Sequence, residues 1–77
     1  MPMQDNITGT EIEERPTYIY NNGAEYKGHW RGMKRESYGV QTWPNGAFYE
    51  GNWLDNMAHG KGIFYHANGD IYDGEWV

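Results

Sequence analysis

The side chains that could perform chemistry in this chain are few and widely spaced. Ser37 is the only serine, it does not lie in a Gly-x-Ser-x-Gly elbow, and no cysteine is present to serve as a nucleophile. Gly60-Lys61-Gly62 begins like a glycine-rich phosphate loop, but a third glycine and a following helix pattern are missing, so we interpret it as the start of a strand. The sequence therefore predicts no catalytic residues and a protein that is not an enzyme.

Three histidines raise the question of a metal site. His29 lies in a strand pattern, His59 in a connector and His66 beside a turn, and no short His-x-His or His-x3-His spacing occurs. We therefore expect neither a metal nor a cofactor. For His66 we expect a cross-strand pair with Asp70, which would favour the charged form of the imidazole.

One basic cluster stands out in the sequence; it consists of Lys27, Arg31, Lys34 and Arg35. Such a cluster could meet anionic phospholipid headgroups, because each exposed basic residue near an acidic membrane contributes about 1 kcal/mol of binding. Neighbouring glutamates offset part of this charge, so we expect any membrane contact to be weak. A solvated charged loop is the alternative interpretation.

Composition limits the classes of protein to which the chain can belong. Its 77 residues and 9.0 kDa allow one small domain. Lys and Arg number 6 against 11 Asp and Glu, and the net charge of -5 argues against a nucleic-acid partner. No apolar run approaches the roughly 20 residues of a membrane-spanning helix, and the first residues lack a secretory signal pattern. We therefore expect a cytoplasmic protein.

Aromatic residues and glycines recur together at a fixed interval. The pattern Tyr-x-Gly-x-Trp occurs three times, 23 residues apart, and Asn-Gly precedes each copy. The repeated aromatic residues are Tyr26, Trp30, Tyr49, Trp53, Tyr72 and Trp76. The period divides the chain into an acidic arm predicted to be disordered (1–16) and a repeat array (17–77). The array holds a partial unit (17–25), two complete units (26–48 and 49–71) and a started unit (72–77).

Each unit has the pattern of a β-hairpin. Strand-forming residues flank the turn at 44–46, where proline sets φ and the glycine can adopt the left-handed conformation. A three-residue loop of this type pairs Gln41 with Tyr49 and Gly39 with Gly51. The hairpin register therefore follows from the turn chemistry alone.

Alternation along the strands places the repeated Tyr and Trp residues on one face, over glycine pairs that leave the backbone bare. The glycines to which we assign this role, or a role in turns, are Gly28, Gly39, Gly46, Gly51, Gly62, Gly69 and Gly74. Polar connectors (31–37 and 54–59) would join successive hairpins. The predicted fold is all-β: a single-layer, twisted antiparallel meander of hairpins with a 23-residue period. Its stripe of six repeated Tyr and Trp residues would stay partly exposed and bind a protein partner.

Tyr-x-Gly-x-Trp at a 23-residue interval, with Gly-x-Gly before the turn and Asn-Gly within it, resembles the membrane occupation and recognition nexus (MORN) repeat. The resemblance covers about residues 17–77, and residues 60–76 carry the pattern nearly complete; in the preceding unit Ser37 replaces the first glycine of Gly-x-Gly. It implies a chain of β-hairpins that serves as an interaction scaffold. Such repeats occur in cytoskeletal and ciliary proteins, in junctional proteins that link membranes, and beside lipid-kinase or methyltransferase domains.

These observations predict a non-catalytic adaptor that binds protein partners in a larger assembly, and the resemblance points to a cytoskeletal or ciliary (axonemal) one. One alternative is a peripheral membrane module that binds anionic phospholipids through the basic cluster. A further alternative is a regulatory fragment of a larger enzyme. The strand expected at 72–76 would present an unpaired edge, so we also expect that the chain can associate with itself there.

Overall fold

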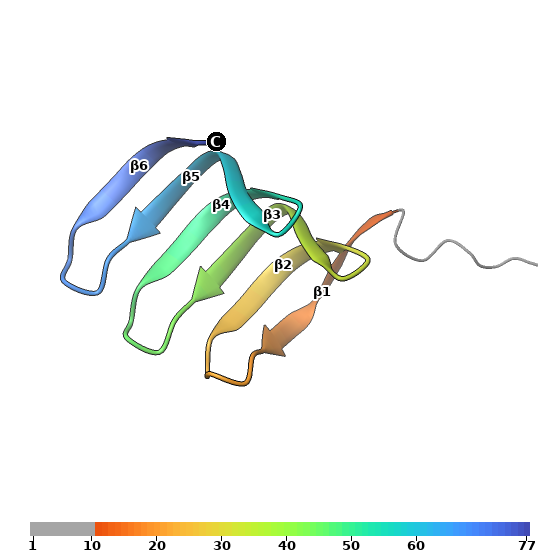
Figure 1. Cartoon of the computed structure of the whole chain (residues 1–77), viewed down its shortest axis with the longest axis horizontal. Coiled ribbons are helices and arrows are strands. Elements are labelled where there is room, and N and C mark those ends of the chain that lie inside the picture. Colours follow the sequence, from red (N-terminus) through yellow and green to blue (C-terminus); the bar gives the residue numbers. More distant parts are fainter. Residues whose placement is uncertain (1–10) are drawn as a thin grey trace, which may run out of the picture.

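Residues 11–77, which the computed structural model of the chain describes, contain six β-strands and no helix. The strands are β1 (Ile12–Ile19), β2 (Glu25–Arg31), β3 (Lys34–Thr42), β4 (Phe48–Leu54), β5 (Met57–Tyr65) and β6 (Ile71–Trp76). They form one sheet in which each strand pairs antiparallel with its neighbours in the chain (Figure 1). The predicted all-β meander of consecutive hairpins is confirmed.

The sheet begins earlier in the chain than we predicted. We expected a disordered arm over 1–16, but residues 12–16 belong to β1 and residues 12–15 pair with β2, while residues 1–10 lie outside the described part. The register of this pair shifts between Arg15 and Tyr18. The acidic composition of the segment suggested disorder. The edge of β2, however, offers backbone N–H and C=O groups with which the segment pairs, and amino-acid composition does not reveal such an edge.

Two kinds of turn join the strands. The longer loops contain the repeated Asn-Gly, and their glycines are all left-handed: Gly23, Gly46 and Gly69 have φ values of 92°, 94° and 98°. In the second of these loops the Asn45 side-chain oxygen accepts a hydrogen bond from the Ala47 N–H, 2.9 Å away. The register predicted for the hairpin at this loop is confirmed.

The other turns are tight, although we expected polar connectors over 31–37 and 54–59. β2 and β3 are joined at Gly32, with φ 61°, and β4 and β5 are joined at Asp55 and Asn56, with φ values of 53° and 74°. Left-handed backbone at these positions reverses the chain within two residues. Most of each expected connector is therefore strand.

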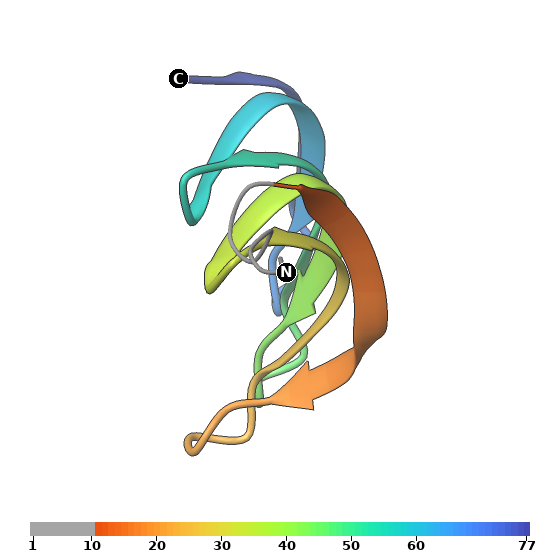
Figure 2. The ribbon, with the colours of Figure 1, turned by 90° about the vertical axis from the view of Figure 1, so that its right-hand side faces the viewer.

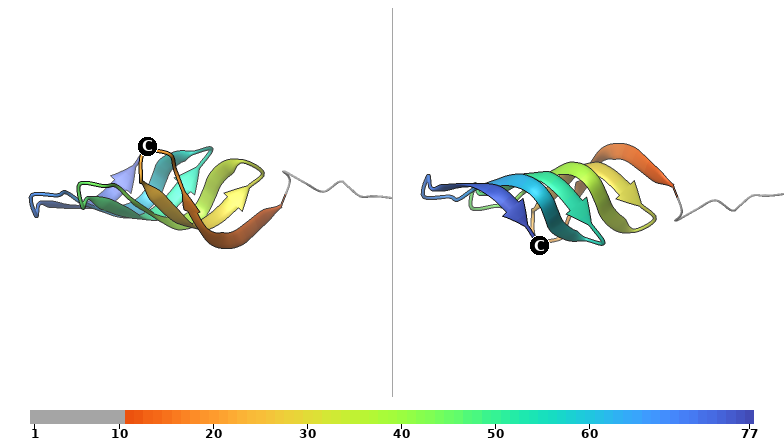
Figure 3. Two further views of the ribbon diagram at one scale, coloured as in Figure 1. Left: turned by 90° about the horizontal axis from the view of Figure 1, so that it is seen from below. Right: turned by 90° about the horizontal axis from the view of Figure 1, so that it is seen from above.

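The sheet is strongly curved across its single layer (Figures 2 and 3). Arg35 and Gln41 are six residues apart on β3, a separation of about 20 Å in a flat strand. Their side chains nevertheless meet, with 2.8 Å between Arg35 Nη1 and Gln41 Oε1. The Tyr26 and Trp30 rings likewise meet along β2, 5.1 Å apart. The strands therefore bend toward the face that carries these side chains, which we call the inner face.

Candidate binding face

Each fully covered tyrosine of the repeat lies over a pair of glycines on neighbouring strands. The Tyr49 ring lies over Gly51 of its own strand and Gly62 of β5, which face each other in the register. A Cβ on Gly62 would overlap the Tyr49 hydroxyl, and a Cβ on Gly51 would overlap the Gly62 backbone. The same arrangement recurs one repeat earlier under Tyr26. Glycine is required at these strand positions because the ring and the adjacent backbone leave no room for a side chain.

Tryptophans connect successive repeats on this inner face. The Trp53 ring packs edge to face against Tyr26 of the preceding repeat and Tyr49 of its own, with centroids 5.5 and 5.2 Å apart. Its indole N–H donates to the Gly39 carbonyl at 3.2 Å. Trp76 repeats this geometry in the next hairpin, against Tyr49. Each of these tryptophans therefore ties two hairpins together.

Burial divides the stripe that we predicted to bind a partner. Four of its six rings are buried and form the core: Tyr26, Trp30, Tyr49 and Trp53. Tyr72 is 50% exposed, and Trp76 is partly buried. The stripe is thus mainly packing core, and four of its members are not accessible to a partner. The sequence could not show this, because the burial depends on the curvature of the sheet.

A second set of rings stays accessible on the same inner face. Tyr20, Trp43 and Phe64 are partly buried and pack against the core. The Trp43 and Phe64 rings lie 5.4 Å apart, and Phe64 lies 6.2 Å from Trp76. We did not predict these residues as contact residues. The signals that could have found them are the 23-residue interval from Tyr20 to Trp43 and the pairing of Phe64 with Tyr72.

The basic residues that we grouped as a possible lipid contact do not lie together. Lys27 and Arg31 are exposed on β2, on the face opposite the core rings. Lys34 lies at the turn into β3 and is also exposed. Arg35 instead turns inward, with its guanidinium carbon 4.6 Å from the centroid of the Trp53 ring. The four charges are therefore distributed over both faces of the sheet.

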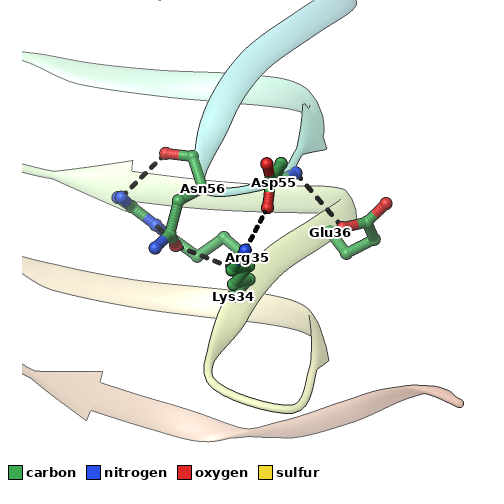
Figure 4. A network of polar contacts seen from close by, with 5 residues as sticks. All are labelled: Lys34, Arg35, Glu36, Asp55 and Asn56. Atoms are coloured by element: carbon green, nitrogen blue, oxygen red, sulfur yellow. Dashed lines mark hydrogen bonds and ion pairs between the residues drawn. The ribbon is translucent and has the colours of Figure 1, made fainter. Parts of the chain in front are cut away.

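A polar network ties the tight turn between β4 and β5 to the start of β3 (Figure 4). Lys34 forms an ion pair with Asp55 at 2.7 Å, and this hydrogen-bonded carboxylate raises the pKa of Lys34. Glu36 accepts a hydrogen bond from the Asp55 N–H at 3.2 Å. Arg35 and Asn56 share more hydrogen bonds than the other pairs of this network. The Arg35 backbone N–H and the side-chain Nε both donate to Asn56 Oδ1, at 2.9 and 3.1 Å. The Arg35 Nη2 also donates to the Asn56 carbonyl, and the Arg35 carbonyl accepts from the Asn56 N–H.

Replacing Asn56 with alanine is expected to lower the free energy of unfolding by about 1–2 kcal/mol, because both Arg35 donors lose the amide oxygen. Asn56 also has a left-handed φ of 74°, which alanine adopts at a cost. Asn56→Gly removes the amide but not the preferred backbone conformation, so it should fall between alanine and wild type. Urea unfolding followed by tryptophan fluorescence measures all three. Equal stability of wild type and Asn56→Ala would show that the network does not hold the turn.

The histidines are dispersed over the sheet. His29 Nδ1 lies 2.7 Å from the Tyr38 carbonyl. The predicted side-chain pair of His66 and Asp70 is not formed: the His66 ring packs on Phe64, with centroids 4.6 Å apart, while the two residues are joined through the backbone. The prediction was wrong because the alternation that places His66 on the inner face brings it next to an aromatic ring.

Burial raises the pKa of two core tyrosines and makes the stability of the fold sensitive to alkaline pH. The Tyr26 side chain is buried, which raises the pKa of its phenol from 10.0 to about 12. Burial also raises the pKa of Tyr49. A pKa that is higher in the folded state stabilises the fold fully below pH 10.0, and this contribution is lost as pH rises toward about 12.

We therefore expect urea unfolding midpoints to fall between pH 10 and about 12. In Tyr26→Phe this fall should be smaller, because one of the buried phenols is gone. The ultraviolet absorbance of tyrosinate provides a second measurement: Tyr26 should ionise only above the range in which exposed tyrosines do. Ionisation of all tyrosines together near pH 10, with the fold intact, would contradict the buried assignment.

Among residues 11–77 no group of three or more His, Asp and Glu side chains is arranged to hold a metal ion. The described part of the chain also contains no helix long and apolar enough to cross a membrane. The inner face presents aromatic rings and the Arg35 guanidinium group. Such a surface suits the recognition of another molecule.

Comparison with protein families matches the MORN repeat to residues 26–48 and 49–71, more than half of the chain. The matched segments each begin at a repeated tyrosine, and each spans one 23-residue period. A search of curated proteins finds no match. MORN repeats are non-enzymatic modules that bind proteins or membranes. With the one-layer meander, the glycine pairs under tyrosine rings and two matched units, the chain belongs to the MORN repeat family.

Proposed function

We propose that this chain is a non-catalytic adaptor whose MORN repeats bind protein partners in a larger assembly. The observation that carries the proposal is the row of partly buried rings on the inner face, which consists of Tyr20, Trp43, Phe64 and Trp76. Aromatic side chains that are already held in place by a core lose little freedom on binding, and they are enriched at protein interfaces. The partner would lie along the inner face, across several hairpins.

The assembly in which we place the chain is cytoskeletal or ciliary, in the cytoplasm. The support for this part of the proposal is the occurrence of MORN repeats in proteins of that kind. Because a fold does not by itself assign a function, the identity of the bound partners decides whether the assembly is cytoskeletal or ciliary.

The alternative, a module that binds anionic phospholipid, requires several basic side chains on one surface. Lys27 and Arg31 lie on the outer face of β2, Lys34 is paired with Asp55, and Arg35 points inward. The two exposed charges of this cluster on the outer face, Lys27 and Arg31, would contribute about 2 kcal/mol near an acidic membrane, which is too little for stable recruitment. This distribution favours the protein-binding function.

Affinity purification of the tagged chain from its own cells, read by mass spectrometry, tests the proposal. The informative pair of variants is Phe64→Ala and Tyr65→Ala, because these neighbours on β5 are both partly buried but lie on opposite faces. Phe64→Ala should lose the partner proteins, whereas Tyr65→Ala should keep them. Circular dichroism of both variants checks that the sheet is retained.

A pelleting assay with vesicles that contain phosphatidylserine accompanies the purification. Two results together would replace the adaptor function with the membrane function. The chain would pellet with these vesicles only at low salt, and the Phe64→Ala variant would recover the same proteins as wild type. Recovery of cytoskeletal or ciliary proteins by wild type would establish the assembly. Recovery of another defined set would keep the adaptor function and correct its location.

A further inference from the structure

A hollow opens on the inner face between β1 and two tight turns. It has a volume of about 450 Å³, and its walls include Tyr18, Tyr20 and Trp30. The Tyr18 ring meets those of Tyr20 and Trp30 edge to face, with centroids 4.8 and 5.8 Å apart. Arg15, which forms an ion pair with Glu13, and Arg35 also line the hollow, and no carboxylate of residues 11–77 lines it. The hollow is therefore aromatic and cationic.

Within residues 11–77, Arg35 holds its charge without a carboxylate partner. Its guanidinium donates to Gln41 Oε1, Asn56 Oδ1 and the Asn56 carbonyl, all neutral acceptors. A guanidinium has five N–H donors, so one on each terminal nitrogen is left. The group is rigidly placed, since it also stacks on Trp53. Two N–H donors of a rigidly held cationic group therefore remain for an anionic acceptor such as a carboxylate.

A buried polar group beside the hollow, in the described part of the chain, also lacks a partner. The indole N–H groups of Trp53 and Trp76 donate to carbonyls 14 residues earlier, those of Gly39 and Gly62. The indole N–H of Trp30 is buried and has no acceptor among residues 11–77. Fourteen residues before Trp30 lies Pro16, where the register of β1 shifts. Proline replaces the repeated glycine there, so the carbonyl is not presented to the indole.

We propose that this hollow binds an acidic side chain of a partner protein, flanked in the partner by apolar or aromatic residues. The carboxylate would pair with Arg35, and the apolar neighbours would pack on Tyr18, Tyr20 and the exposed Met33 at the rim. The Arg15 guanidinium, which is paired with Glu13 and whose carbon lies 5.5 Å from the Trp30 ring centroid, lines the same wall. This inference rests on the proposed protein-binding function and specifies the chemistry of the segment that is bound.

A peptide segment fits this site better than a lipid headgroup does. The sheet is curved (Figure 2), and the hollow lies on its inner side, where it is lined by Tyr20, Trp30 and Arg35. A narrow chain can enter such a concave side more easily than a flat bilayer can approach it. Arg35 has no counterpart in the next repeat, where the equivalent position is Ala58. Arg35 therefore supplies its charge at one end of the inner face and not in each repeat, as expected for fixing the register of a bound segment.

Two short peptides that differ only in charge test the inference on the full chain. The probes are acetyl-Leu-Glu-Phe-amide and acetyl-Leu-Gln-Phe-amide, and the readout is the nitrogen-15 NMR spectrum of the protein. The glutamate peptide should shift the Trp30 indole N–H and Arg35 Nε–H signals. The glutamine peptide should bind about tenfold more weakly, because hydrogen bonds to a charged acceptor are the stronger ones.

Arg35→Gln and Lys34→Gln form the matched pair of variants. Arg35→Gln should abolish the preference for glutamate over glutamine, whereas Lys34→Gln, which removes an exposed charge one residue away, should retain it. If Arg35→Gln does not fold, the comparison of the two peptides on the wild-type chain decides alone. Arg35→Lys then keeps the charge without the planar group, and should bind the glutamate peptide more weakly than wild type.

Three results would overturn the inference. The first is equal affinity for the two peptides, or no shift with either. The second is a shift of the same two signals by phosphatidylserine vesicles with no shift by the glutamate peptide. The third is a concentration-dependent shift without any peptide, which would assign the hollow to a second copy of the chain. If any of these occurs while Phe64→Ala still loses the purified partners, the adaptor function stands and only the acidic anchor is wrong.

Discussion

Gly51→Ala is expected to lower the free energy of unfolding by about 3 kcal/mol or more, which is a large share of the stability of a small domain. A Cβ at this position would overlap the Cα of Gly62 and lie 2.7 Å from both the Lys61 carbonyl oxygen and the Tyr49 hydroxyl. Backbone atoms of a paired strand cannot move aside without breaking the ladder. The expected result in thermal unfolding followed by circular dichroism is a fall in Tm of about 10 °C or more.

Gly74→Ala is the matched control, since Gly74 occupies the same position one repeat later. There the nearest atom to an added Cβ is the Tyr72 hydroxyl oxygen, 3.0 Å away, and the Tyr72 side chain is half exposed and can shift. We expect a change within about 0.5 kcal/mol of wild type. If the two variants lose the same stability, the cost would come from removing glycine as such and not from the packed strand beyond it.

Trp53→Ala is expected to cost about 3–5 kcal/mol of unfolding free energy. Trp53 is only 7% exposed, and it contacts the rings of both Tyr26 and Tyr49. Its removal also leaves the Gly39 carbonyl without its donor and the Arg35 guanidinium without its stacking surface. Because Trp53 links two hairpins, we expect the unfolding transition to broaden as well as shift, as the repeats lose their coupling.

Trp43→Ala provides the control for this second variant. Trp43 is partly buried, and its ring contact is with Phe64 at 5.4 Å, outside the buried cluster. We expect a loss of about 1 kcal/mol, measured by urea unfolding with the remaining tryptophans as probes. A result in which Trp43→Ala is the more damaging variant would mean that the core is centred on the accessible row of rings. That would also remove the basis for assigning that row to partner binding.

The aromatic residues needed for stability differ from those available for binding, although the sequence pattern assigned both roles to one stripe of Tyr and Trp residues. Trp53 belongs to the core, so its replacement reports on folding and cannot serve as a clean test of partner contact. Phe64 and Trp43 are the residues whose replacement should affect binding with the sheet intact. The distinction follows from the exposed fraction of each ring and not from its position in the repeat.

The repeat period, the hairpin register and the need for glycine under each tyrosine could all be predicted from the sequence, because they depend on contacts between residues close in the chain. The Asn-Gly turn selects a three-residue loop, and the loop determines that Gly39 faces Gly51. Alternation then places the rings of Tyr49 and Trp53 on one face. The family assignment rests on the same local pattern.

The start of the sheet and the position of the basic side chains could not be predicted in this way. Residues 12–16 are acidic and poor in apolar residues, yet residues 12–15 pair with β2 because a strand edge is available there. Arg35 lies in a charged run and was expected on the surface. It points inward because the bend of β3 brings it within reach of Gln41 and because Asn56, 21 residues further along, supplies three acceptor contacts.

The sequence by itself thus determined the period, the hairpins, their register and the family of this protein. The tertiary structure decided which rings are core and which are accessible, and that one guanidinium group lines an aromatic hollow. The physical reason is the range of the interactions. Turn chemistry and strand alternation act over a few residues, whereas burial arises only when a curved single layer brings Trp53 of one hairpin over Tyr26 of the hairpin before it.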